Sequence, residues 1–230
     1  MDEFVAEFQA EAERRREVGD PEWTVGARVH PAVVRSVQRF QVGEAGDGVN
    51  LIAKAAGEGA YSVAVRLFVA EEQNHARMLA LLLEAAGAST IASHWSDVVF
   101  VRLRRGLGLR LELLVLMVAE VIALAYYRLL RDGTADPLVT EVAGRILGDE
   151  RRHVPFHCRR LRTAFPPAVR PVVFWVWRVL LFGASVVVAF DHGSALTVFG
   201  TTRRGFVGEV NRLVGSGAIR LFPLSGRPVG

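Results

Sequence analysis

Apolar side chains recur at every third or fourth position over most of this chain, which is the repeat of helices that bury one face. The pattern predicts four long helices, at about 31–56, 59–86, 107–131 and 136–164. Pro31 stands in the first turn of the first of these, where its missing N–H is tolerated, and Pro166-Pro167 follows the last. We therefore expect an all-α fold.

Short breaks separate these four helices into two pairs. Gly57-Glu58-Gly59 lies inside the first pair, and the run from Asp132 to Pro137 lies inside the second. Breaks this short favour antiparallel helical hairpins. Residues 88–106, between the pairs, form a longer connection of mixed character. Such a connection suits the crossover between two hairpins of a four-helix bundle.

Further helices are expected on both sides of the bundle. They lie at about 2–18, followed by a loop, at 168–190, and at 203–214, and the last dozen residues look irregular. The chain is thus divided into an N-terminal helix and loop (1–30), the bundle (31–165), and an apolar helix with a basic tail packed on the bundle (166–230). His30 and His94 fall in loop or cap positions, and His192, after the apolar helix, has no assigned role.

The stretch from Pro171 to Phe190 is apolar except for Arg178 and Ser185, and its length almost suffices to span a bilayer. Arg178 near its centre would cost about 2.5–3.5 kcal/mol in the membrane interior. We therefore expect a helix packed over the bundle, or a subunit interface in a homodimer, rather than an integral membrane segment. Peripheral contact with a membrane surface is the alternative.

Charge is distributed unevenly along the chain. Residues 151–230 hold 12 arginines against Asp191 and Glu209. A basic C-terminal third could face an acidic carrier protein, an acidic electron donor or anionic lipid, or it could simply solvate the outside of helices. Nucleic acid is not expected as a partner, because no DNA-binding motif or aromatic-interleaved basic patch is present.

The single cysteine, Cys158, excludes an internal disulfide and favours a reducing cytoplasm. It also excludes an attached iron centre held by four thiolates. The acidic, helix-like stretch from Met1 to Val18 does not have the pattern of a signal peptide, so we expect a cytoplasmic protein.

Candidate chemistry lies in two Glu-x-x-His units on different predicted helices, Glu72 with His75 and Glu150 with His153. Residues three apart share one helix face, so each pair can reach one metal ion. A single glutamate precedes each unit on the partner helix: Glu44 lies 28 positions before Glu72, and Glu120 lies 30 positions before Glu150.

The turns lie near the midpoints of these intervals, so the paired residues should stand at equal height in each hairpin, about 20 Å from the turn. Four helices would then bring four carboxylates and two imidazoles to one level of the core, where apolar neighbours such as Phe68, Leu79 and Met117 surround them. Buried charges are costly unless they are paired or bind a metal. This set is that of a di-metal carboxylate site.

The ordered pattern Glu…Glu-x-x-His…Glu…Glu-x-x-His, over residues 31–165, resembles the ferritin-like superfamily of non-haem di-iron proteins. The resemblance implies that one metal takes Glu44, Glu72 and His75. The other takes Glu120, Glu150 and His153, with some carboxylates bridging. Carboxylate and imidazole ligands suit two iron ions, and manganese or a mixed pair would also fit.

Several neighbours of the six candidate ligands are candidates for supporting roles. The run from Asp149 to His153 is similar to the Asp-Glu-x-Arg-His form of many di-iron oxidases and acyl-carrier-protein desaturases, so Asp149 is expected to orient a ligating imidazole, with Arg152 as its charge partner. Glu71 could do the same or face solvent.

His157 shares the face of His153 and could be a seventh ligand, as in some di-iron N-oxygenases, or a core histidine hydrogen-bonded one turn away. Tyr127 faces the site and could take part in electron transfer or only fill space. Gly43, Gly46 and Gly48 surround Glu44 and weaken its helix, which close packing, a local departure from α geometry, or a route for substrate to the metals would explain.

The functional expectation is an O2-activating di-metal oxidase or oxygenase that acts on an organic, apolar substrate. Its length and first ligand pair are similar to those of aldehyde-deformylating oxygenases, but desaturation, hydroxylation, deformylation and N-oxygenation stay open. Electrons would come from an external reductase or ferredoxin, since no nucleotide-binding fingerprint is present. The alternatives are a ferroxidase or iron-handling protein, a di-manganese peroxide scavenger, and a non-catalytic bundle.

Overall fold

The computed structural model describes residues 1–46, 48–105, 107–215, 219, 221 and 222. Within these residues the chain is helical and has no strand, which confirms the all-α class. The elements in chain order are α1 (Asp2–Val18), η1 (Trp23–Val25), α2 (Pro31–Glu44), α3 (Val49–Lys54), α4 (Ala60–Ala85), α5 (Trp95–Arg105), α6 (Leu109–Asp132), α7 (Pro137–Ala164), η2 (Pro167–Val169), α8 (Arg170–Asp191), α9 (Gly193–Val198) and α10 (Arg203–Gly215).

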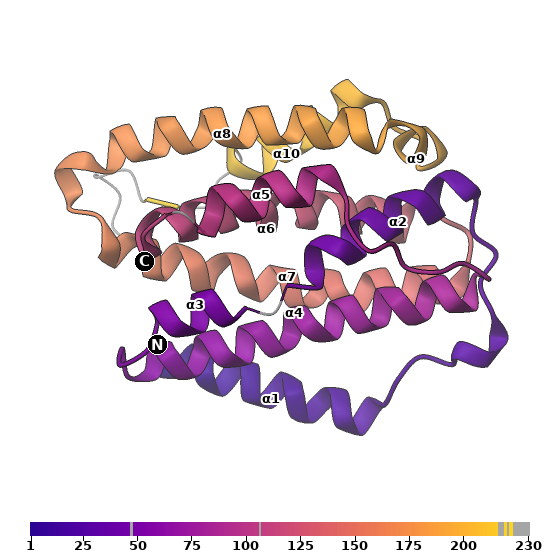
Figure 1. Cartoon of the computed structure of the whole chain (residues 1–230), viewed down its shortest axis with the longest axis horizontal. Coiled ribbons are helices and arrows are strands. Elements are labelled where there is room, and N and C mark those ends of the chain that lie inside the picture. Colours follow the sequence, from indigo (N-terminus) through magenta and orange to yellow (C-terminus); the bar gives the residue numbers. More distant parts are fainter. Residues whose placement is uncertain (47, 106, 216–218, 220, 223–230) are drawn as a thin grey trace.

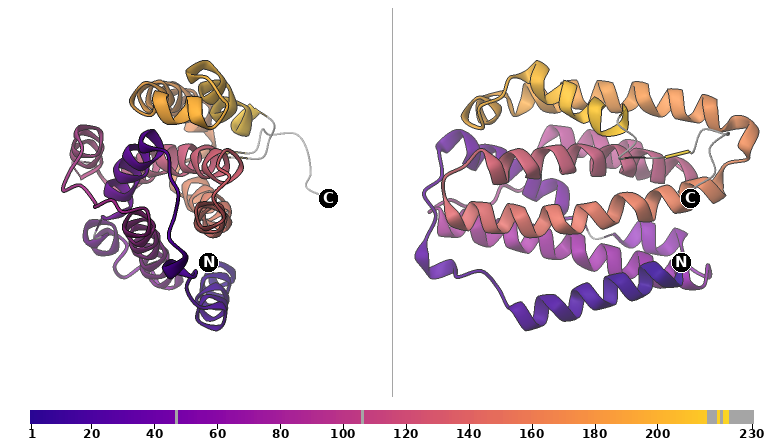
Figure 2. Two further views of the ribbon diagram at one scale, coloured as in Figure 1. Left: turned by 90° about the vertical axis from the view of Figure 1, so that its right-hand side faces the viewer. Right: turned by 180° about the vertical axis from the view of Figure 1, so that it is seen from behind.

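The long helices α2, α4, α6 and α7 lie side by side and enclose the apolar core (Figure 1). Helix α6 packs along α7 after a short turn, α2 packs on α4, and α4 packs on α7. Helix α1 covers α4 on one side, and α8 with α10 covers α6 on the opposite side (Figure 2). Additional helices therefore cover the four-helix core on two opposite sides.

Two of these helices begin where local sequence signals predict. Pro31 opens α2, and the ring Nδ1 of His30 accepts a hydrogen bond from the backbone N–H of Ala32, 3.1 Å away. Pro137 opens α7, and the Asp136 carboxylate caps two backbone N–H groups of its first turn. A capping acceptor followed by proline is a strong start signal, because it satisfies exposed donors and presets the first helical φ angle.

The helix predicted at 31–56 is not continuous, so the expectation of one unbroken helix was wrong. Helix α2 ends at Glu44 and α3 begins at Val49. Gly48, between them, has φ +63°, a left-handed conformation that glycine adopts without a Cβ penalty. The glycine cluster thus produces a local departure from α geometry beside Glu44, one of the explanations that the sequence left open.

The crossover at 88–106 also differs from a simple loop, since it contains α5. Helix α5 packs on α6 and α2. The short α9, which the pattern did not predict, packs on α2. The expectation of an irregular last dozen residues falls outside the described part of the chain, apart from residues 219, 221 and 222.

Two helices in the described part of the chain are long and apolar enough to cross a membrane. In the core helix Leu109–Asp132, 78% of the apolar 18-residue window is buried within the protein, whereas in Pro167–Asp191 only 22% of such a window is buried. The apolar segment at 171–190 is therefore packed over the other helices on one side, as expected, but its opposite side is uncovered (Figure 2).

Candidate metal centre

Four helices carry the six candidate ligands to one place in the core. Glu44 is the last residue of α2, Glu120 lies in α6, α4 carries one Glu-x-x-His unit and α7 carries the other. Five of the six side chains are buried, and the sixth, Glu72, is 19% exposed. Because the two hairpins place these residues at similar distances from their turns, the side chains meet at one level.

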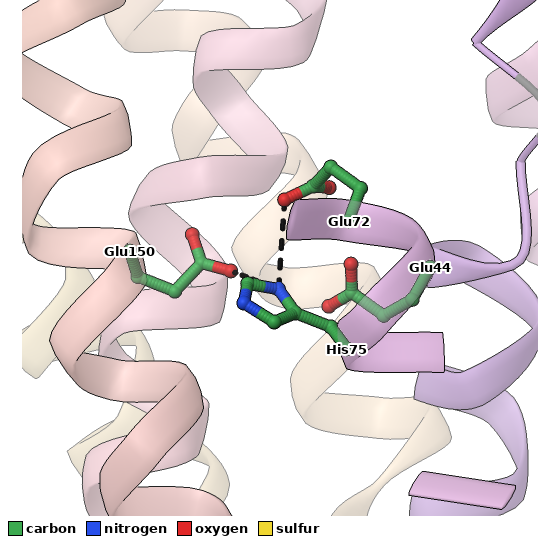
Figure 3. Close-up of side chains that lie close together, drawn as sticks. All are labelled: Glu44, Glu72, His75 and Glu150. Atoms are coloured by element: carbon green, nitrogen blue, oxygen red, sulfur yellow. Dashed lines mark ion pairs between the residues drawn. The ribbon is translucent and has the colours of Figure 1, made fainter. Parts of the chain in front are cut away.

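The ligand atoms form two groups, each with its members within 4.8 Å of one another. In the first, His75 Nδ1 lies 3.5 Å from both a Glu72 oxygen and a Glu150 oxygen, and Glu44 completes the group (Figure 3). Its members come from α2, α4 and α7. Three carboxylates around one imidazole nitrogen can hold a divalent cation.

The second group lies around His153. Its Nδ1 is 3.2 Å from Glu72, 3.4 Å from Glu120 and 3.6 Å from Glu150. Glu72 and Glu150 belong to both groups. Glu150 presents a different oxygen to each imidazole, whereas the same Glu72 oxygen, Oε1, lies near both.

Several atoms of both groups that could bind a metal ion have no hydrogen-bond partner among the described residues. They are Glu72 Oε1, His75 Nδ1, Glu120 Oε2, Glu150 Oε2 and His153 Nδ1. Buried polar atoms in proteins are nearly always satisfied, and leaving one unpaired costs about 1–3 kcal/mol. Five such atoms that face one another fit a pair of cations, which would satisfy all of them.

The far nitrogens of both imidazoles are held by carboxylates from the opposite Glu-x-x-His unit. His75 Nε2–H donates to Asp149 over 2.9 Å, and His153 Nε2–H donates to Glu71 over 2.9 Å. Each acid that precedes one unit therefore orients the histidine of the other. This leaves both Nδ1 atoms directed at the cluster, the arrangement that metal-binding histidines usually have.

Arginines neutralise this outer pair of acids. Arg152 binds Asp149, as the sequence predicted, and lies 3.4 Å from Glu71. Glu71 is only 1% exposed, so it does not face solvent. Arg15 of α1 lies 2.7 Å from Glu71 and 3.3 Å from Asp149. Glu11, also on α1, lies 3.6 Å from Arg152 and extends the network.

Sequence reasoning did not find the role of α1. Arg15 sits in a run of three arginines at the end of an acidic helix, and such a run usually faces solvent. The signal that was available is the excess of buried acids in the bundle, since four carboxylates and two preceding acids require cations beyond Arg152. Helix α1 therefore supports the site through its charge as well as covering it.

Burial and mutual repulsion set the protonation of the cluster. Burial, together with the nearby charge of Glu72, raises the pKa of Glu44 well above its usual range. Burial and the charge of Glu120 do the same to the pKa of Glu150. Burial alone would lower the pKa of His153, but the close carboxylates of Glu120, Glu150, Glu71 and Glu72 outweigh it and raise that pKa. Without cations, the cluster thus retains protons that metal ions would displace.

The pKa of the outer acid Asp149 is shifted in the opposite direction. Burial acts to raise the pKa of Asp149, but the hydrogen bond from His75 and the charges of His75, Arg152 and Arg15 outweigh it and hold that pKa below its usual range. Asp149 is therefore a permanent anion that keeps the Nε2 proton on His75.

Tyr127 has a more specific position than that of a filler. Its hydroxyl donates a hydrogen bond to Glu44 Oε1 over 2.7 Å. Burial and the neighbouring Glu44 raise the pKa of Tyr127 well above its ordinary value, so the hydroxyl stays a donor. Tyr127 thereby fixes one oxygen of Glu44 and leaves the other for the cluster.

His157 is fully buried and lies outside both ligand groups. Its Nε2 is 3.7 Å from Glu120 Oε1, and neither ring nitrogen has a hydrogen-bond partner in the described residues. His157 is therefore a core histidine, as one of the two expectations had it, but the expected hydrogen bond one turn away is not found among the described residues. Burial and the nearby His153 lower the pKa of His157 to about 3, so the ring is neutral and has a free lone pair.

The three glycines near Glu44 have different surroundings. Gly43 and Gly46 are exposed, and a Cβ at either would meet nothing within 4 Å. A Cβ at Gly48 would overlap the side chain of Val69 on α4, so this glycine permits close helix packing. Among the six candidate ligands, Glu72 is the most exposed, at 19%.

A cleft of about 430 Å³ lies on the other side, between α1, α4 and α7. Phe8, Arg15, Met78 and Asp149 are among its lining residues, and none of the six candidate ligands is. The cleft thus reaches the outer network rather than the cluster.

A second buried polar cluster, absent from the sequence expectations, connects α2, α6 and the start of α9. Ser36 Oγ lies 2.8 Å from the Tyr126 hydroxyl and 2.7 Å from His192 Nδ1. Burial lowers the pKa of His192 to about 3, with the charges of Arg39 and His94 acting in the same direction. His192 is therefore a neutral packing residue that joins the outer helices to the core.

Neither a family model, nor a curated protein, nor a solved structure matches this chain. The interpretation of the site accordingly depends on its own geometry and chemistry.

Proposed function

We propose that this protein is an O2-activating non-haem di-iron oxidase or oxygenase of the ferritin-like superfamily. The observation that carries the proposal is the pair of overlapping ligand groups that share Glu72 and Glu150, with unpartnered donor atoms directed into them. A site for a single ion needs no shared carboxylates. A surface cluster of acids would not be buried, and its imidazoles would not have their far nitrogens held by further carboxylates.

In this proposal Glu44, Glu72 and His75 would hold one ion, and Glu120, Glu150 and His153 would hold the other. Glu72 and Glu150 would contribute to both sites, because each belongs to both groups. Oxygen and nitrogen donors without thiolates suit iron or manganese, so two iron ions are proposed and a manganese or mixed pair is the variant. When bound, two such ions would supply the redox chemistry that reduces O2.

The surrounding residues keep the ligands in place. Asp149 and Glu71 hold the far N–H groups of the two histidines, and Tyr127 holds Glu44. The apolar side chains of α4 and α6 exclude water from the cluster. We propose that the substrate approaches on the Glu44 side, past Gly43 and Gly46, where the helix is interrupted and Glu72 is partly exposed.

The substrate is proposed to be organic and apolar, and electrons would come from an external reductase or ferredoxin. The basic C-terminal third could receive an acidic donor or an acidic carrier protein. Iron handling is the second candidate, since the cleft of about 430 Å³ does not reach the ligands and a ferroxidase needs no organic-substrate pocket.

The direct test is metal loading under anaerobic conditions with Fe(II) or Mn(II), followed by metal counting. We expect two ions per chain. Glu150→Ala should remove at least one ion and abolish O2 consumption by the reduced protein, while Glu84→Ala, at an exposed position on α4, should change neither. A wild-type chain that retains no metal would refute the proposal.

The candidate functions separate in the same preparation. An oxygenase should consume O2 in proportion to an organic substrate and an added reductase. A ferroxidase should consume O2 in proportion to added Fe(II) alone, and a storage protein should elute as a cage-sized assembly. A peroxide scavenger should release O2 from hydrogen peroxide in its manganese form.

His157 can be tested separately as a seventh ligand. Its neutral ring and free nitrogens would allow coordination beside Glu120. His157→Ala should then alter the Mössbauer parameters of one iron, with the metal count unchanged. Unaltered spectra would show that the ring acts only in packing.

A further inference from the structure

The outward side of α8 is an exposed apolar surface. Its residues, called here the α8 outer face, are between 42% and 71% exposed: Val172, Trp175, Val176, Val179, Leu180, Phe182, Val187 and Phe190. They follow one side of the helix from its first turn to its last, and no charged residue lies among them. Large contiguous apolar patches are rare on soluble proteins and usually mark an interaction surface.

The opposite side of α8 is an ordinary core face. Trp177, Leu181, Ser185 and Ala189 are buried where the helix packs on α6 and α10. Helix α8 therefore has protein behind it from Trp177 to Ala189 (Figure 1). A helix in this position can lie in the plane of a surface with its outer half inserted, but it cannot cross a bilayer without leaving the fold.

Arginines border this face. Among the described residues 167–215, five arginines stand against two acids, which gives +3. Arg178 lies three residues after Trp175 and four before Phe182, so it borders the face on α8 itself. Arg203 lies over the ring of Phe190, with the guanidinium carbon 5.1 Å from the ring centre, and the exposed Arg204 follows it.

The two acids of this region are already neutralised. Asp191 lies 3.2 Å from Arg39 of α2. Glu209 forms ion pairs with Arg128 of α6 and with Arg212. The rim of the α8 outer face therefore presents arginines without acids that would balance them.

This charge argues against a second copy of the chain as the occupant. Two copies that paired through the face about a twofold axis would bring rims of the same sign together. Like charges placed across an interface weaken association. Anionic lipid headgroups have the complementary charge, and the acyl region beneath them accepts Trp, Phe and Val side chains.

We propose that the α8 outer face docks on a bilayer that contains anionic lipid, with α8 lying in the plane of the membrane and the arginines contacting headgroups. The proposal does not depend on the metal centre, because α8 contributes none of the candidate ligands. The protein would then be peripheral, with Trp175 at the depth where this side chain is favoured.

The test is co-sedimentation of the full chain with vesicles of phosphatidylcholine alone and with vesicles that also contain phosphatidylglycerol, at about 0.15 M salt. We expect binding to the anionic vesicles to be at least about tenfold tighter than to the neutral ones. Val179→Glu, at the centre of the face, should weaken that binding at least about tenfold. Replacing Arg203 and Arg204 with Gln should weaken it by about fivefold per arginine.

Val25→Glu is the matched control, because Val25 is 67% exposed and lies in η1, away from α8. Both valine positions are on the surface, so neither variant should unfold, which circular dichroism checks. Equal binding to neutral and anionic vesicles would overturn the proposal, as would equal effects of the two valine variants. A dimer in sedimentation velocity that Val179→Glu dissociates, without vesicle binding by the wild type, would assign the face to a second copy and overturn it as well.

Discussion

Glu150→Gln should stabilise the metal-free protein and destabilise the metal-loaded one. Glu150 is buried and belongs to both ligand groups, and its oxygens lie within 4.8 Å of Glu72 and Glu120 oxygens in the second group. Two like charges at that separation repel by about 3.5 kcal/mol at an effective dielectric constant of 20. Gln has the same shape and no charge.

Protonation and the neighbouring His153 reduce this repulsion, so the expected gain for the metal-free variant is about 1–2 kcal/mol. For a chain of this size each kcal/mol shifts the unfolding midpoint by roughly 2–4 °C, which gives an increase of roughly 2–8 °C. A bound metal at 100 times its Kd stabilises the wild type by about 2.7 kcal/mol per site. The variant should lose most of that, and the order of stability should reverse.

Differential scanning calorimetry in a chelator, and again with Fe(II) under anaerobic conditions, measures both effects. Glu84→Gln is the matched control, because it makes the same chemical change at an exposed position of α4. A Glu150→Gln variant that is less stable than the wild type without metal would show that the carboxylate serves the fold. The reasoning that the cluster is strained without cations would then fail.

Three further outcomes follow from the structure. Asp149→Asn removes the anion that holds His75 and should weaken metal binding by about 10–100-fold in chelator competition, with the helical content unchanged; unaltered affinity would contradict its orienting role. Gly48→Ala should cost about 1–3 kcal/mol in urea unfolding, because φ is +63° and a Cβ overlaps Val69, and a cost below about 0.5 kcal/mol would refute the packing argument. Burial raises the pKa of Cys158 to about 12, so at pH 8 its alkylation should be at least about a hundredfold slower in the folded protein than in urea, and equal rates would refute its burial.

The helices and the convergence of the six acidic and imidazole side chains were accessible from the amino-acid order. Helix boundaries follow apolar periodicity and strong local signals such as Asp136-Pro137. Charged residues that lie inside apolar stripes, at matched distances from two turns, are expected to face one another in the core. That argument needs only the rise per residue of a helix and the cost of burying charge.

Partners across helices were less accessible, because they depend on how each helix is rotated and crossed against its neighbours. Spacing alone could not reveal that Glu71 serves His153 while Asp149 serves His75. It also could not reveal that Arg15, on a helix far away in the chain, neutralises both acids. Such contacts arise only when separate elements are packed together.

The apolar helix α8 also shows the difference between what the sequence predicts and what only the packed structure decides. Its composition predicts burial, since apolar residues occur on nearly every side. Packing against α6 and α10 covers one side and leaves Val172, Val179 and Phe190 exposed. Composition can state that a helix prefers to leave water, but the number of neighbouring helices limits how much of it the fold covers, and that number is a property of the assembled chain.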